Sequence, residues 1–113
     1  LLALLVLSGR ATGVAAHAEP ERANPPIDGV VPAAPAVVDV RFDEELRPGE
    51  TTVQVIGPRG MQVDSGDAAV DLMDRGRKHV TVSLRPNLGP GAYSVQWRSV
   101  SAEDGDTDQG IYG

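Results

Sequence analysis

The stretch PGAYSVQWR, residues 90–98, decides the fold. After the turn residues that open it, the apolar side chains of Tyr93, Val95 and Trp97 alternate with polar ones. A period of two residues is typical of a β-strand with one buried and one solvated face. We therefore expect a half-buried strand here.

The same alternation recurs along the chain, with turn residues between the strands. Clear strands are expected at residues 37–42, 51–56 and 80–84, weaker ones at 61–63 and 69–73, and a last strand that begins at 111–112 and is cut short by the end of the chain. No stretch has a helical period. Short strands at a spacing of about 8–12 residues favour an antiparallel sandwich of two sheets. The prediction is an all-β, Ig-like Greek-key β-sandwich.

The first residues have the composition of an export signal. Residues 1–7 are wholly apolar, and small residues fill 11–16. Seven apolar residues are too few for a membrane-spanning helix, which needs about 20. We expect a signal peptide at 1–16, truncated at its start, before an exported domain at 17–113. Cleavage after Ala16 would leave His17 as the first residue, whereas cleavage after Ala18 would remove it.

The segment that follows, residues 19–35, is rich in proline and alanine. Proline removes a backbone donor and restricts the residue before it, which excludes a helix interior. An extended arm with turns is expected.

Composition excludes several classes of function. The formal net charge is −6 with no basic stripe, which argues against nucleic acid as a partner. The chain has no cysteine, so any metal would need nitrogen or oxygen ligands. It has two histidines and no nucleophile elbow or phosphate-binding loop. We expect neither an enzyme nor a protein with a small-molecule substrate.

Two features could bind a cation. A histidine at the mature N-terminus offers its α-amino and ring nitrogens to one ion, a donor set that suits Cu(II). The acidic loop 101–110 contains Asp104, Asp106 and Asp108 at the spacing of a calcium loop, but Gln109 stands where the sharp turn needs glycine. The other histidine, His79, is interpreted as an exposed residue at a strand end and not as a ligand.

Five segments together resemble one family, the CopC copper-resistance domains, and the similarity runs from His17 to Tyr112. The most specific part is the strand at 90–98 followed by Val100-Ser101-Ala102-Glu103-Asp104-Gly105. The other segments are His17-Ala18, Asn24-Pro25 to Asp28-Gly29, and Val40-Arg41-Phe42-Asp43-Glu44.

The resemblance implies a periplasmic or other extracytoplasmic Ig-like sandwich that binds Cu(II) and catalyses no reaction. It implies a copper carrier or buffer in copper resistance or homeostasis, with a membrane copper transporter as partner and tethering beyond the C-terminus. His17, Asp104 and Glu44 match the family's ligand positions, while Asp106 stands where the family has a loop histidine. On this basis His17 and Asp104 are the main expected ligands, with Asp106 and Glu44 as supporting carboxylates.

A carboxylate in place of imidazole is a harder donor, so weaker copper binding than in the family is expected. Met61 and Met73 are only two and are expected at core or turn positions, which does not support Cu(I) transport. One alternative is a sandwich that has lost copper and serves as an interaction or structural module, with calcium in the acidic loop. A copper oxidase with a histidine brace is disfavoured, because only His79 could supply the second histidine.

Overall fold

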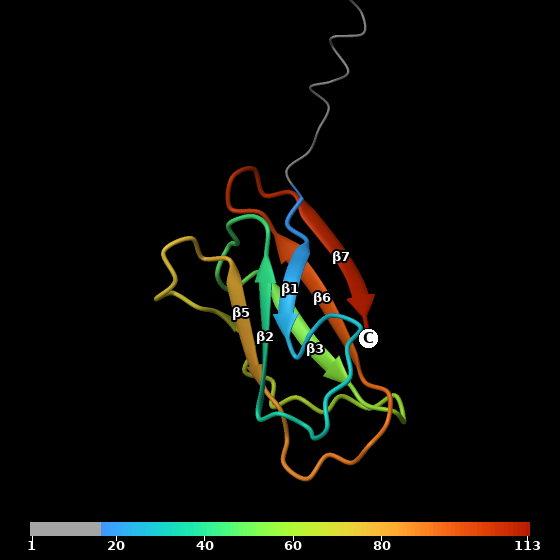
Figure 1. Ribbon diagram of the computed structural model, residues 1–113. Coiled ribbons are helices and arrows are strands. Elements are labelled where there is room, and N and C mark those ends of the chain that lie inside the picture. Colours follow the sequence, from blue (N-terminus) through green and yellow to red (C-terminus); the bar gives the residue numbers. More distant parts are fainter. Residues whose placement is uncertain (1–16) are drawn as a thin grey trace, which may run out of the picture.

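The computed structural model describes residues 17–113, and the predicted signal peptide lies outside this part. Within it the chain forms strands and no helix, and two antiparallel sheets lie face to face (Figure 1). The strands are β1 (Pro20–Asn24), β2 (Val37–Phe42), β3 (Thr52–Ile56), β4 (Ala69–Val70), β5 (His79–Ser83), β6 (Ser94–Val100) and β7 (Thr107–Tyr112). One sheet has the order β1-β2-β5-β4 and the other β3-β6-β7. The predicted all-β sandwich is confirmed.

The four-stranded sheet is organised by the alternation in β2. Val38, Val40 and Phe42 are buried, whereas Asp39 and Arg41 lie on the outer face. Val40 pairs with Ala23 of β1 on one side and with Val80 of β5 on the other. Because side chains of paired residues point to the same face of a sheet, the apolar residues of neighbouring strands meet on the inner face.

The three-stranded sheet is centred on β6, the strand predicted from the alternation of Tyr93, Val95 and Trp97. Trp97 pairs with Val53 of β3 and with Gly110 of β7. A Cβ atom at position 110 would lie 2.7 Å from the Trp97 ring, so only glycine fits there. Across the core, the Trp97 ring packs edge-on against Phe42, with centroids 5.8 Å apart and planes at 75°. This contact joins the two sheets.

The core consists of the inward-facing apolar side chains of both sheets. Burying one such side chain stabilises the fold by about 1.5–3 kcal/mol relative to leaving it in water. The largest apolar ones that are fully buried are Phe42, Leu46, Val40, Val53, Val80 and Val82.

A buried carboxylate covers the outer edge of β3. Asp64 is 1% exposed, and its two oxygens accept hydrogen bonds from the backbone N–H groups of Val55 and Gly66 and from the side chain of Gln62. A buried polar group is tolerated only when it has such partners. Asp64 therefore satisfies the N–H of Val55 at this edge, while the carbonyl of Val55 accepts the N–H of Val63.

The structure corrects three sequence predictions. The extended arm contains β1, which pairs with β2. The last strand begins at Thr107, so the loop before it ends at Asp106 and is shorter than the predicted 101–110. The weak strand at 69–73 is strand only at Ala69–Val70, and the one at 61–63 forms only an isolated bridge at Gln62.

Three loops meet at one end of the sandwich. The N–H of Phe42 bonds to the carbonyl of Lys78, that of Arg47 to Val100, and that of Ala102 to Glu45. These bonds tie together the loops β2–β3, β4–β5 and β6–β7. In residues 17–113 no helix is long and apolar enough to cross a membrane.

Candidate metal centre

His17 is positioned by the two residues that follow it. Ala18 is fully buried, and its carbonyl accepts a hydrogen bond from the hydroxyl of Ser99 in β6. Glu19 and Asp43 are joined by two bonds, since the N–H of Glu19 donates to the Asp43 carboxylate at 2.9 Å and the N–H of Asp43 donates to the Glu19 carbonyl at 3.0 Å. The chain is therefore fixed immediately after His17, at the end where the three loops meet.

The β6–β7 loop, residues 101–106, is closed by its own backbone. The N–H of Gly105 bonds to the carbonyl of Ser101, and the N–H of Ser101 bonds to the carbonyl of Asp106. Gly105 has a φ of +75°, a conformation that glycine adopts without steric cost. The Asp104 carboxylate accepts the N–H of Asp106 at 2.9 Å, so one of its oxygens is used within the loop.

His17 and Asp106 meet across this end. The Nδ1 atom of His17 lies 3.8 Å from Oδ2 of Asp106, and the two side chains are 44% and 41% exposed. Metal–nitrogen and metal–oxygen bonds are about 2.0–2.2 Å long, so two ligand atoms of one ion lie at most about 4 Å apart. The observed separation therefore allows both atoms to bind the same ion.

The other two predicted ligands are not gathered with this pair. Asp104 is exposed, and Glu44 is partly buried in the β2–β3 loop. In the described residues no group of three histidine, aspartate or glutamate side chains is close enough to hold a metal ion. The structure thus brings together His17 and Asp106, and it leaves Asp104 and Glu44 outside the pair.

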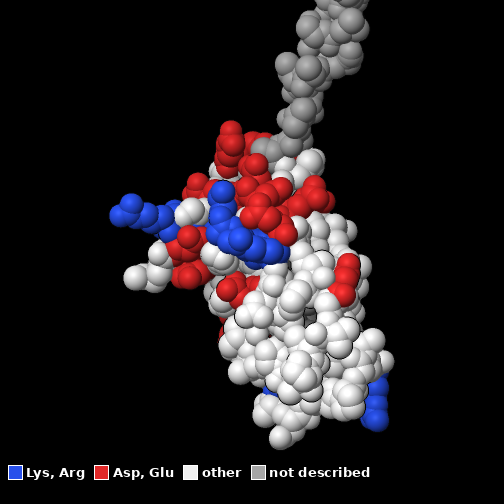
Figure 2. Space-filling model, viewed as in Figure 1, with Lys and Arg blue, Asp and Glu red and all other residues white. Residues whose placement is uncertain are grey.

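Charge is concentrated at this end. Glu19 and the loops 43–51, 71–78 and 101–106 hold ten carboxylates and four basic side chains, a formal charge of −6 that equals that of the whole chain. Figure 2 shows most of the charged side chains gathered at the same end, with the other part of the visible face largely uncharged. A surface of one sign raises the local concentration of the opposite ion. This end therefore favours cations.

One basic side chain in this region was not predicted. The guanidinium of Arg47 lies so close to Gly105 that a Cβ atom there would be 3.0 Å from it. It places a positive charge against the acidic β6–β7 loop and offsets part of its repulsion. No sequence pattern indicates this contact, because Arg47 and Gly105 belong to different loops.

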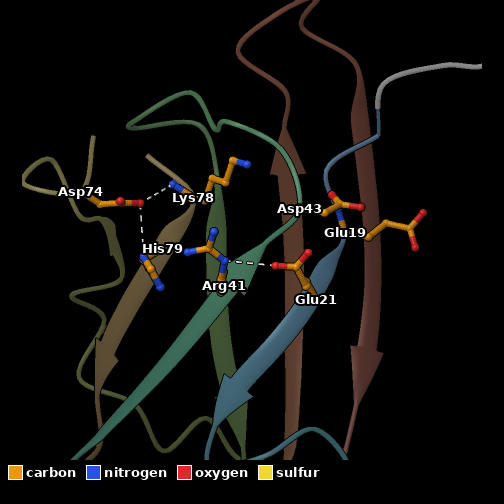
Figure 3. A network of polar contacts seen from close by, with 7 residues as sticks. All are labelled: Glu19, Glu21, Arg41, Asp43, Asp74, Lys78 and His79. Carbon is orange, nitrogen blue, oxygen red and sulfur yellow. Dashed lines mark hydrogen bonds and ion pairs between the residues drawn. The ribbon is translucent and has the colours of Figure 1, made fainter. Parts of the chain in front are cut away.

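The second histidine has another environment. Nδ1 of His79 lies 3.2 Å from Oδ2 of Asp74, and both side chains are about a quarter exposed (Figure 3). His79 is thus partly buried and paired, where the sequence predicted an exposed strand end. The N–H of Lys78 also donates to the Asp74 carboxylate, and these two hydrogen bonds hold the pKa of Asp74 below its ordinary value.

The two methionines are not in the core. Met61 is 66% exposed and Met73, in the turn of the β4–β5 loop, is 91% exposed. The prediction of a core or turn position therefore holds only for Met73, which lies in a turn.

Comparison with known proteins places these observations in a family. Residues 21–113 match the model of the CopC domain. Over 111 residues the chain is 32% identical to Protein YobA of Escherichia coli strain K12, covering 98% of this chain and 87% of that protein. Over 97 residues it is 30% identical to the copper transport protein CutJ of Bacillus subtilis strain 168, covering 85% of this chain and 17% of that protein.

Two solved structures have the same fold. The crystal structure of CopC from Methylosinus trichosporium OB3b superposes with a TM-score of 0.69 at 25% identity, covering 85% of this chain and 89% of that one. PcoC of Escherichia coli, a methionine-rich copper resistance protein, superposes with a TM-score of 0.68 at 29% identity, covering 86% and 95%.

Proposed function

Because this chain belongs to the CopC domain family, we propose that it is an exported copper(II)-binding protein that holds the ion between His17 and Asp106. The family membership expected from the sequence motifs is confirmed. One observation carries the residue assignment: these two side chains approach to 3.8 Å at the end that carries the net charge.

The donor atoms suit Cu(II) when export leaves His17 as the first residue. The α-amino nitrogen and the imidazole of His17 then supply two nitrogen ligands, and Asp106 supplies a carboxylate oxygen. Mixed nitrogen and oxygen ligands in tetragonal geometry are typical of Cu(II). Asp104 and Glu44, which the structure does not gather with this pair, contribute negative charge to the same end of the sandwich.

Asp106 also sets the selectivity that we propose. Copper prefers imidazole to carboxylate more strongly than calcium or magnesium does, because carboxylate is the harder ligand. A site with Asp106 is therefore expected to bind Cu(II) more weakly than one with a second histidine. Such an affinity suits a carrier or buffer that takes up and releases copper outside the cytoplasm.

A membrane copper transporter is the partner that we propose for this carrier. The similar segment of the Bacillus copper transport protein makes up 17% of that protein, so a domain like this one is part of a longer transport protein there. The exposed acidic end would present copper to such a partner, because His17 and Asp106 are both accessible from outside.

A second candidate function is a sandwich that has lost copper. It is favoured by the observation that no third histidine, aspartate or glutamate side chain joins His17 and Asp106 in the described residues. In this case the protein serves as an interaction or structural module, and the acidic loop binds calcium through carboxylate oxygens.

An equilibrium titration distinguishes the two candidates. Cu(II) is added to a protein that begins at His17 and to one that begins at Ala18, each with and without excess calcium or zinc. The copper proposal expects one equivalent of Cu(II) to bind the first protein, none to bind the second, and no displacement by calcium. Calcium binding without copper binding in the first protein would support the second candidate and contradict the first.

A further inference from the structure

The outer face of the four-stranded sheet carries a row of basic side chains. Arg22 of β1 pairs with Arg41 of β2, and Arg41 pairs with His79 of β5. The three residues are therefore direct neighbours across three strands, on the face opposite Val40 and Val80. Like charges that face each other across strands are destabilising, so such a row needs compensation.

Two carboxylates compensate the row from its sides. Oε2 of Glu21 lies 3.1 Å from Nε of Arg41, and Oδ2 of Asp74 lies 3.2 Å from Nδ1 of His79. In Figure 3 the Arg41 guanidinium lies between His79 and Glu21. Each contact uses one nitrogen, which leaves the terminal nitrogens of Arg41 and Nε2 of His79. Arg22 forms no ion pair with another residue of the described part.

The row borders a small hollow of about 130 Å³. Its lining consists of the three basic residues together with Ala23, Asn24 and Asp39. Asp39 pairs with no cation among residues 17–113, and its Oδ1 atom is buried without a hydrogen-bond partner. The hollow thus has cationic donors at the level of Arg22 and Arg41, and a carboxylate without an ion-pair partner at the level of Asp39.

The charge of Asp39 also acts on the partly buried side chain of Tyr112. Burial, together with the carboxylates of Asp28 and Asp39, raises the pKa of the Tyr112 hydroxyl to about 12. Asp39 thus lies close enough to this hydroxyl for the two groups to interact electrostatically. A cationic group placed in the hollow would therefore be attracted to Asp39.

We propose that this hollow binds a small zwitterion of the α-amino acid type. The carboxylate of the ligand is held by Arg22 and Arg41, and its ammonium group faces Asp39. Asn24 and His79 supply further polar contacts. A simple anion would leave Asp39 without an ion-pair partner, and a simple cation would face two guanidinium groups.

The size and place of the hollow fit this ligand. About 130 Å³ is well below the roughly 300–1,000 Å³ of sites for drug-sized molecules, and it has room for an amino acid such as glycine or alanine. The sequence did not predict a site here. Neither His17 nor Asp106 lines the hollow, so this inference does not depend on copper binding.

The test is an NMR titration of ¹⁵N-labelled protein, residues 17–113, with glycine. Acetate and methylammonium, each carrying one half of the zwitterion, are titrated separately at the same ionic strength. We expect saturable shifts of the amides around Asn24 and Asp39 with glycine, and binding at least about tenfold weaker with either half-ligand. If acetate binds as tightly as glycine, the hollow is an anion site only, and the proposal is wrong.

Variants identify the two ends of the ligand. Arg22→Gln and Asp39→Asn are each expected to weaken glycine binding about tenfold, since each removes one charged hydrogen-bond partner. Arg98→Gln, an exposed arginine on the other sheet, is the matched control and should leave binding unchanged. Asp39→Asn keeps the size of the side chain, Arg22→Gln shortens it and removes its charge, and the amide spectra of both variants show whether the fold is retained. Unchanged binding in a folded Arg22→Gln or Asp39→Asn protein, or no saturable shift with glycine, would contradict the zwitterion site.

Discussion

The two histidines of this chain each face one aspartate, but the two pairs are built differently. His79 and Asp74 approach to 3.2 Å, are about three-quarters buried, and share the aspartate with the N–H of Lys78. His17 and Asp106 are 3.8 Å apart and more exposed, and the described structure gives the Asp106 carboxylate no other partner. The first pair fixes a loop to a strand, whereas the second keeps its donor atoms available. Residue type alone therefore does not separate a structural pair from a binding pair.

The largest expected effect is a loss of Cu(II) affinity that distinguishes His17 from His79. His17→Ala should lower Cu(II) affinity about 100-fold or more, because it removes an imidazole ligand, while the matched His79→Ala should leave it unchanged. Competition titration with a Cu(II) chelator measures both. Equal losses in the two variants would show that the comparison is wrong.

A substitution that should strengthen Cu(II) binding tests the same comparison. Asp106→His should tighten Cu(II) binding about tenfold and lower any affinity for calcium, since imidazole replaces a hard oxygen donor. Asp108→His, two residues further along the chain and inside β7, is the control. If Asp106→His binds copper no better than the natural chain, Asp106 does not contact the ion.

The fixed segment after His17 predicts a smaller effect. Ser99→Ala removes the buried hydrogen bond to the Ala18 carbonyl and should cost about 1–2 kcal/mol of unfolding free energy. Cu(II) affinity should fall severalfold, because His17 becomes less well positioned. Urea unfolding and copper titration of the same samples measure both changes. Full copper affinity in a destabilised Ser99→Ala protein would mean that this anchor does not position His17.

The smallest effect concerns the structural pair. The pKa of Asp74 is lowered in the folded state by the hydrogen bonds from Lys78 and His79. Its contribution to stability is therefore present above the unfolded pKa and is lost as the pH falls through the lower, folded pKa. Asp74→Asn should reduce the difference in melting temperature between about pH 6 and about pH 2–3, with copper binding unchanged. An identical pH dependence of the melting temperature in the variant would show that Asp74 does not make this contribution to stability.

The central strands could be predicted because their alternation reflects burial on one face. Strand β1 lacks this signal, since its sequence PERAN has only one small apolar side chain and depends on pairing with β2. The start of β7 is polar as well, and it is held by pairing with β6 and by the close fit of Gly110 beneath Trp97. Edge strands without apolar alternation are thus determined by their neighbours.

The candidate site could be predicted from the sequence in part. The family motifs point to the acidic loop and to His17, but they do not show which aspartate faces the histidine. That depends on the turn at Gly105, where the Asp104 carboxylate bonds to the N–H of Asp106. The contact of Arg47 with this loop and the hollow beside Asp39 join residues far apart in the chain, so no local pattern reveals them.

The most direct measurement of the central claim is electron paramagnetic resonance of the protein that begins at His17, loaded with one equivalent of Cu(II). The account predicts a tetragonal signal with hyperfine structure from nitrogen, which disappears in the protein that begins at Ala18. A signal from oxygen ligands alone, or the same nitrogen signal in both proteins, would contradict it.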